Sequence, residues 1–169
     1  MKKEISRVIL YLGYILILFA WLFTIVTIDV FNGNITINFV KILNFIDLYN
    51  ALIILAFSFL VICISGLFFP FKKAFSLILN KQQYSHEEHA KSSLAVRAFM
   101  VSAIIGGIIS AIIQCITMQS SMEVYTGVGI YISLAFLSIF YSLLICALLL
   151  PVYIYLKKDV IDEKYKTLK

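Results

Sequence analysis

Four polar side chains lie deep inside long apolar runs of this 169-residue chain. Ser110 and Gln114 are four residues apart in one run, and Ser138 and Ser142 repeat that spacing in a later run. Residues four apart share one face of a helix, so each pair aligns its hydrogen-bonding groups along one side. A polar group in an apolar environment needs a partner, which is either another helix or a cavity that holds water and ions. The spacing therefore favours helix packing or an ion path, and both interpretations stay open.

Small residues surround these groups and indicate close contact between backbones. Two adjacent rows run along one segment at four-residue spacing, namely Ser102, Gly106, Ser110 and Gln114, and Ala103, Gly107, Ala111 and Cys115. A stripe of this kind lets a second helix approach closely, either within the protein or between copies. We expect close packing at Ser102, Gly106 and Gly107.

The segment 86–89, His-Glu-Glu-His, is the best candidate for a metal site. Its histidines are three residues apart with no third ligand nearby, and it differs from the zinc motif His-Glu-x-x-His. We therefore interpret these residues as free, solvent-exposed side chains on a helical linker. Cys63, Cys115 and Cys146 lie apart inside apolar runs, where cysteine acts as a small hydrophobe. With no Ser/His/Asp set and no Gly-rich phosphate loop, we expect no metal, no cofactor and no enzymatic activity.

The elements that must position these side chains are four apolar runs. The chain is 62% apolar with a mean hydropathy of +1.00, and 14% of its residues are charged, against about a quarter in soluble domains. Runs long enough to cross a bilayer as helices cover residues 8–27, 51–71, 98–118 and 127–156. The stretch from Asp47 to Asn50 is typical of a helix cap before the second run. We predict an all-α, polytopic membrane protein with four transmembrane helices in one domain, a short cytoplasmic linker at 72–97 and a cytoplasmic tail at 157–169.

The basic residues indicate the orientation. They cluster before the first run, between the second and third, and after the fourth, with Lys41 as the exception. Because loops rich in Lys and Arg stay in the cytoplasm, we expect both termini and the middle loop to be cytoplasmic. The positive charge suits anionic lipid headgroups, whereas a nucleic-acid interface would need a basic, aromatic face on a soluble domain. No Asp, Glu, Lys or Arg lies deep within a run, so an ion path would need a carboxylate from another subunit.

Short motifs occur in three of the four runs. The second run is preceded by Phe45-Ile-Asp and ends at Pro70 followed by Lys72-Lys73. The third has Arg97-Ala-Phe-Met, then Gly106-Gly107 and Ser110. The fourth has Gly127-Val-Gly, Ser138, Tyr141 and Leu150-Pro151. Together these motifs resemble the MotA branch of the MotA/TolQ/ExbB family over most of the chain.

The resemblance implies a multi-pass subunit of the bacterial inner membrane, similar to a stator subunit. Members of the family form a pentameric homo-oligomeric ring around single-span partner helices that carry an ion-binding Asp. By this resemblance Arg97 would lie at the cytoplasmic mouth of an ion path. The residues that would face the central helices or line the path are Ser110, Gln114, Ser138, Tyr141 and Ser142.

The chain also departs from the family's pattern. It has Ile104 where the family's third span has a Pro, and the linker at 72–97 is far shorter than the cytoplasmic domain with which motility stators engage a rotor. We therefore predict a reduced scaffold subunit that is coupled to proton or sodium flow and does not drive a flagellar rotor. The alternative is a small accessory or immunity protein that binds another membrane protein and conducts nothing.

Overall fold

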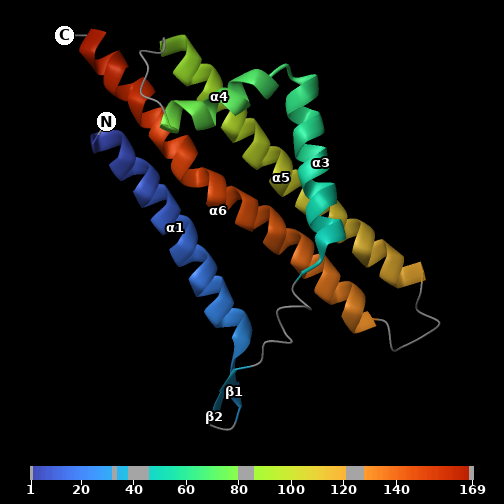
Figure 1. The fold of residues 1–169 in the computed structure, drawn as a ribbon. Helices are drawn as coiled ribbons and strands as arrows, with labels where there is room; N and C mark the ends of the chain where they lie inside the picture. The colour runs from blue at the N-terminus through green and yellow to red at the C-terminus, as the bar shows by residue number, and fades with distance from the viewer. Residues whose placement is uncertain (1, 32–33, 38–45, 80–85, 121–127, 168–169) are drawn as a thin grey trace. The chain divides into compact units, whose positions relative to one another are not determined.

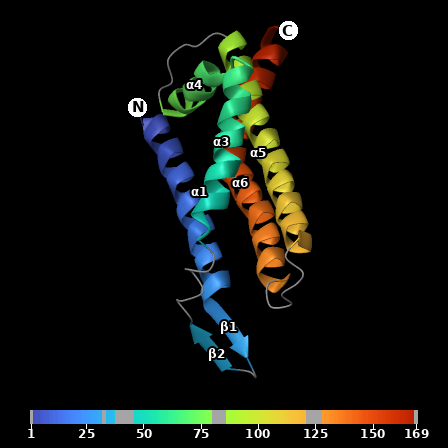
Figure 2. The same ribbon diagram turned by 90° about the vertical axis from the view of Figure 1, so that its right-hand side faces the viewer.

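The computed structural model describes residues 2–31, 34–37, 46–79, 86–120 and 128–167. These residues form five helices and one pair of strands, shown in Figure 1 and turned by 90° in Figure 2. The chain divides into two compact units, Met1–Leu48 and Tyr49–Lys169. The predicted helical class is confirmed, with one short β-hairpin in addition.

The first unit contains one helix and the hairpin. Its elements are α1, Lys2–Thr27, β1, Ile28–Phe31, and β2, Asn34–Ile37. The two strands pair antiparallel along their whole length, and both are rich in β-branched residues, which favour an extended backbone. The apolar part of α1 that the structure describes is Ile9–Thr24, which is shorter than the roughly 20 residues of a transmembrane helix. A first transmembrane helix at 8–27 therefore stays a prediction.

The second unit begins with two helices where one was predicted at 51–71. Helix α3, Leu48–Ile64, is followed by helix α4, Phe68–Leu79, at an angle of 107°. Gly66, between them, has a positive φ of 68°, a conformation that glycine adopts without the strain of a Cβ. The predicted helix is thus interrupted, because the chain turns at this glycine.

The hydrogen bonds at the end of α3 explain why the turn is sharp. The Leu67 N–H donates to the Ile62 carbonyl over 2.9 Å, and the Gly66 N–H donates to the Cys63 carbonyl over 3.1 Å. This pair of bonds is the Schellman motif, which ends a helix at a left-handed glycine and satisfies its last carbonyls. The Ile62 and Cys63 carbonyls at the end of α3 are therefore paired where the chain turns.

The other two helices of this unit form a long antiparallel pair. They are α5, His86–Ser120, and α6, Val128–Thr167. Both extend beyond the apolar runs predicted at 98–118 and 127–156, and α6 includes most of the tail. At the start of α5, Lys91 pairs with Glu87 over 2.6 Å, an i,i+4 contact that stabilises helix in polar sequence. Much of the predicted linker is therefore helical.

An aromatic cluster joins α3 and α4 to α5. The ring of Phe71 in α4 stacks on the ring of Phe99 in α5, with centroids 4.8 Å apart. Phe59 of α3 meets the same Phe99 ring edge-on at 5.1 Å. Because Phe99 contacts both helices, it fixes the bend of the chain against α5.

The outer faces of α5 and α6 are apolar. Within the described residues, two helices are long and apolar enough to cross a membrane, over Glu87–Thr117 and Gly129–Lys158. The bent pair of α3 and α4 adds a third if the pair is one span. On α5 a stripe of isoleucines is between 38% and 62% exposed, namely Ile104, Ile105, Ile108, Ile109, Ile112, Ile113 and Ile116. A contiguous apolar stripe is rare on surfaces that face water. The features are those of a membrane protein, and the count of four transmembrane helices stays a prediction.

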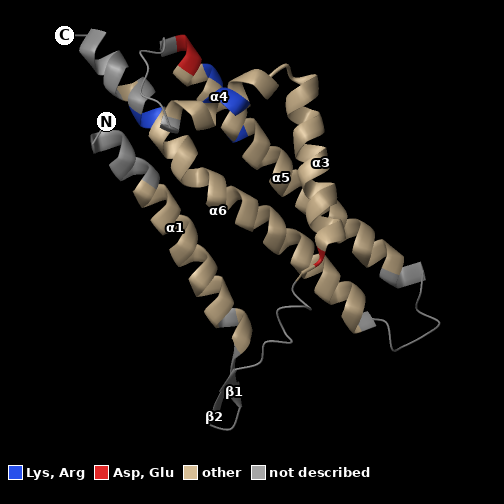
Figure 3. Ribbon diagram, viewed as in Figure 1, with Lys and Arg blue, Asp and Glu red and all other residues tan. Residues whose placement is uncertain are grey.

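Charged residues of the second unit gather at one end (Figure 3). They lie on α4, on the first turns of α5 and near the end of α6, which runs antiparallel to α5. Lys73 of α4 forms an ion pair with Glu88 of α5. This agrees with the expectation that the middle segment and the tail lie on one side of a membrane. That this side is the cytoplasm stays a prediction.

Candidate functional site

A buried cluster of polar side chains lies where α3, α5 and α6 meet. Ser110 Oγ of α5 is 3.1 Å from Asn50 Oδ1 of α3 and 3.2 Å from Ser138 Oγ of α6. Gln114 Nε2, one turn further along α5, is 3.5 Å from the same Asn50 oxygen. Asn50 is 1% exposed and Ser138 is fully buried. The cluster therefore lies inside the second unit, with Gln114 at its half-buried edge.

The donors and acceptors of this cluster form an ordered series. Ser110 donates to Asn50 Oδ1, so Ser138 is the donor when the two hydroxyls bond to each other. Ser138 Oγ also lies 3.0 Å from the Leu134 carbonyl, so its single hydrogen can alternate between that carbonyl and Ser110. Asn50 Oδ1 accepts from both Ser110 and Gln114 with its two lone pairs. These bonds avoid the cost of about 1–3 kcal/mol for each polar group buried without a partner.

Two glycines determine how closely the helices approach α5. A Cβ on Gly107 would lie 2.5 Å from Ser142 Oγ and 3.0 Å from the Ser138 carbonyl oxygen of α6. A Cβ on Gly106 would meet the Phe57 ring of α3 at 3.1 Å. One row of small residues on α5 thus faces α3 and the other faces α6. The stripe packs helices of one chain, and Ser110 contacts both neighbours.

The structure brings three predicted site residues together, Ser110, Gln114 and Ser138. Ser142 lies one turn along α6, where it donates to the Ile139 carbonyl over 2.7 Å and faces Gly107. The sequence left two interpretations open for these side chains, packing between helices and a surface toward a partner helix or an ion path. Ser110, Ser138 and Ser142 face helices of their own chain, because α3 and α6 pack against α5 at Gly106, Gly107 and Ser110. A role toward a partner stays a prediction.

The other predicted residues lie apart from this cluster. Tyr141 is half-buried on α6, and Arg97 is exposed on α5. Ser102 is buried and donates to the Phe99 carbonyl over 2.9 Å, so its hydroxyl bonds within α5. Cys146 contributes a further contact between the long helices, since its Sγ lies 3.4 Å from the Met100 carbonyl.

Asn50 is the member of the cluster that the sequence analysis did not identify as a site residue. We interpreted it as part of a helix cap, because it follows Asp47 at the start of an apolar run. In the structure it is the third residue of α3, and its side chain is buried against α5. The signal available in the sequence was an amide residue at the start of an apolar run. Helix-cap residues and buried core residues both occur at that position, so the sequence alone does not distinguish them.

The segment His86-Glu-Glu-His89 forms the first turn of α5. Glu88 pairs with Lys73 and Glu87 pairs with Lys91. These carboxylates are therefore engaged in ion pairs and are not the free side chains that we expected. In the part of the chain that the structure describes, no three His, Cys, Asp or Glu side chains are placed to share a metal ion.

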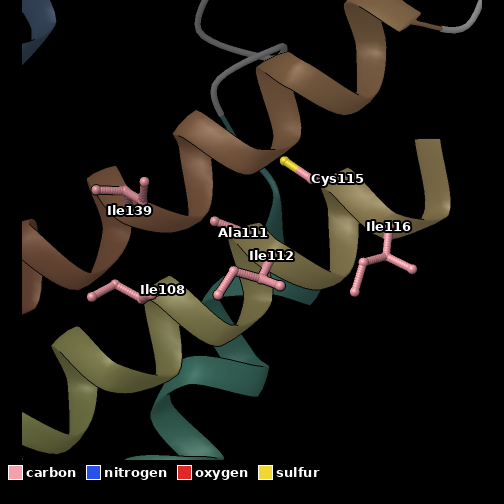
Figure 4. A pocket seen from close by; sticks show the side chains of 6 residues that line it. All are labelled: Ile108, Ala111, Ile112, Cys115, Ile116 and Ile139. Carbon is pink, nitrogen blue, oxygen red and sulfur yellow. The ribbon is translucent and has the colours of Figure 1, made fainter. Parts of the chain in front are cut away.

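An apolar groove runs along the seam between α5 and α6 (Figure 4). It has a volume of 330 Å³ and is lined by Ile108, Ala111, Ile112, Cys115, Ile116 and Ile139. Ala111 and Cys115 belong to the small-residue row that faces α6, and their small side chains form the floor between larger isoleucines. The groove lies beside the polar cluster, since Ala111 and Cys115 directly follow Ser110 and Gln114.

Fold and site together define a helical protein with two, or at most three, helices able to span a membrane among the residues described. Its central feature is an internal polar cluster next to an open apolar groove. A scan of protein-family models and searches of curated proteins and of solved structures find no match to this chain. Its function is therefore argued from the residues and their geometry.

Proposed function

We propose that the chain is a reduced scaffold subunit of the MotA/ExbB type in a bacterial inner membrane. Several copies form a ring around a single-span partner, and the assembly couples to proton or sodium flow. The observation that carries the proposal is the apolar groove on the α5–α6 pair. Most of the motifs that resemble this family lie on the same two helices.

The groove has the chemistry of a site for another membrane helix. Small residues at a helix interface let a neighbouring backbone approach closely, and Ala111 and Cys115 form such a floor. Helices bind in apolar grooves through side chains at three- and four-residue spacing, the spacing at which Ile108, Ile112 and Ile116 line the rim. A helix of a second copy or of the partner fits these requirements.

Coupling to ion flow requires an ionisable group that the spanning segments do not contain. No Asp, Glu, Lys or Arg occurs in 48–64, 98–120 or 128–156. The acidic residue must therefore belong to the partner helix. In the proposal, this chain contributes packing surface and, at the edge of the polar cluster, the half-buried amide of Gln114.

A second candidate function is a non-conducting accessory or immunity protein. The observation that favours it is that the hydrogen bonds of Ser110, Ser138 and Asn50 are made within one chain. A polar cluster satisfied in this way stabilises the protein without any partner or ion. The two functions differ in whether the groove is occupied and in the number of copies.

Photocrosslinking in native membranes tests the proposal with a matched pair of positions. Ile112 lines the groove and is 52% exposed, whereas Ile113, its neighbour outside the groove, is 55% exposed. A benzophenone amino acid at position 112 should crosslink to a second copy or to a single-span protein, and the same group at 113 should react mainly with lipid. Native mass spectrometry of the purified assembly should show more than two copies. A monomer with equal, lipid-only crosslinking at both positions would leave the accessory protein as the better account.

A further inference from the structure

A second cavity lies between α4 and the first turns of α5, at the charged end of the unit. It has a volume of 230 Å³ and is lined by Phe69, Pro70, Lys73, Glu88, Lys91 and Ser92. Its lining therefore combines an apolar wall with two ammonium groups, one carboxylate and one hydroxyl. This combination suits a ligand that has both an anionic and an apolar part.

The hydroxyl of Ser92 is buried without a hydrogen-bond partner among the described residues. Ser92 is 1% exposed. Comparable helical hydroxyls in the chain donate to the preceding turn, as Ser58 does to the Ile54 carbonyl and Ser133 to the Gly129 carbonyl, each over 2.8 Å. Buried hydroxyls are nearly always paired, because an unpaired one loses its hydrogen bonds to water and gains none in the protein. Ser92 can therefore accept a partner that comes from outside the chain.

The two lysines make the cavity a site for an anion. Lys73 pairs with Glu88, and Lys91 pairs with Glu87. An ammonium group has three N–H donors, so each lysine can bond to an anionic oxygen and keep its carboxylate partner. Glu87 does not line the cavity, so the lining has two cations and one carboxylate and a net positive charge. A phosphate oxygen can accept from both ammonium groups and from the Ser92 hydroxyl.

The apolar wall of the cavity and its level along α5 relative to the membrane point to a phosphate that belongs to a lipid. Phe69 is 79% exposed beside the cavity. Ser92 lies six residues before residue 98, where the apolar run begins, which is about 9 Å along the helix axis. The polar layer of a bilayer extends roughly 5–8 Å beyond its hydrocarbon core. The cavity therefore lies at about the level of the headgroups when α5 spans the membrane.

We propose that this cavity binds the phosphate of a phospholipid headgroup. Lys73, Lys91 and Ser92 hold the phosphate oxygens, while Phe69 and Pro70 contact the glycerol and the first acyl carbons. Glu88 faces the same cavity and can receive the ammonium of an ethanolamine headgroup. This inference does not depend on the proposed ring, because the cavity is formed within one chain.

Lipid titration followed by native mass spectrometry tests the site. The full-length protein in detergent is titrated with palmitoyl-oleoyl phosphatidylglycerol, with the matching phosphatidylethanolamine, and with inorganic phosphate. We expect one saturable lipid per chain and little binding of free phosphate. Ser92→Ala should weaken lipid binding about tenfold, the loss expected for one hydrogen bond to a charged group. Lys73→Gln should weaken it further, because it removes a charge as well.

The control is Ser93→Ala, which removes a neighbouring hydroxyl that does not line the cavity. It should leave lipid binding unchanged. In lipid-free detergent, Ser92→Ala should have the same melting temperature as the wild type or a higher one, because it removes an unpaired buried group. An unchanged or raised melting temperature shows that the variant is folded. Equal lipid binding by the wild type, Ser92→Ala and Lys73→Gln would overturn the site. Binding of inorganic phosphate as tight as that of lipid would overturn the assignment to a lipid.

Discussion

The contact between Gly107 and α6 yields the sharpest prediction, because an adjacent glycine supplies the control. In Gly107→Ala the new methyl carbon would lie 2.5 Å from Ser142 Oγ, 2.6 Å from Ser142 Cβ and 3.0 Å from the Ser138 carbonyl oxygen. A rotamer change of Ser142 moves Oγ but leaves its Cβ and the backbone oxygen in place. The helices α5 and α6 must therefore separate for the alanine to fit.

The expected magnitude follows from two opposing effects. Overpacking of a tight interior contact costs typically 1–3 kcal/mol, and this contact is at the upper end because backbone has to move. Alanine in place of glycine within a helix gains about 1 kcal/mol. We expect Gly107→Ala to lower the free energy of unfolding by about 2 kcal/mol. In Gly106→Ala the only tight contact of the methyl is with the Phe57 ring, at 3.1 Å, since the Ile54 Cα lies at an ordinary 3.8 Å. A ring can shift, so that variant should be neutral within about 1 kcal/mol.

Reversible unfolding in mixed micelles measures both variants, and a double variant tests the cause. Ser142→Gly removes the two nearest atoms, so Gly107→Ala combined with Ser142→Gly should recover much of the loss that Gly107→Ala causes alone. A double-mutant cycle then gives a favourable coupling energy between these positions. If Gly107→Ala were as stable as Gly106→Ala, or if the cycle gave no coupling, the close approach of α6 to Gly107 would be refuted.

Three further predictions concern the polar cluster, the bend and the topology. Asn50→Leu removes the shared acceptor, so it should destabilise the protein by about 1–2 kcal/mol in the same unfolding assay, and a change under 0.3 kcal/mol would argue against the cluster. Gly66→Ala should lower the free energy of unfolding by about 1 kcal/mol because Gly66 has a positive φ. The control Gly13→Ala, inside α1 with open space around it, should leave that free energy unchanged or raise it in the same unfolding assay. Reporter fusions after Asn80 and after Glu123 should give opposite signals, with Asn80 on the cytoplasmic side, and a periplasmic signal at Asn80 would refute the predicted topology.

The helices could be predicted from the apolar runs, but their ends could not. The bend at Gly66 falls inside a run that stays hydrophobic from Ala51 to Phe71, so hydropathy alone gives no sign of it. Its local signal is a single glycine after a serine, and such a pair is tolerated inside many helices. The early start of α5 has a different origin, because its first turns are polar and stabilised by the Lys91–Glu87 pair.

Three of the four residues of the polar cluster could be predicted from their spacing, and Asn50 could not. The four-residue intervals placed Ser110 with Gln114 on one face of a helix, and Ser138 with Ser142 on one face of another. Spacing within a helix does not say which face of which neighbour lies opposite. That depends on how closely Gly107 lets α6 approach and on where Asn50 falls on α3, and both are set by tertiary packing.

The burial of the Asn50 amide also has a consequence for the order of synthesis. Its partner Ser110 follows it by 60 residues, which a ribosome adds in roughly 3–12 s. Through that interval the contacts of Asn50 with α5 cannot form, because the residues of α5 have not yet been added. The hydrogen bonds that Asn50 accepts from Ser110 and Gln114 therefore stabilise α3 only once α5 lies beside it. The cluster is completed later still, when α6 supplies Ser138, so it forms in the order in which the chain is made.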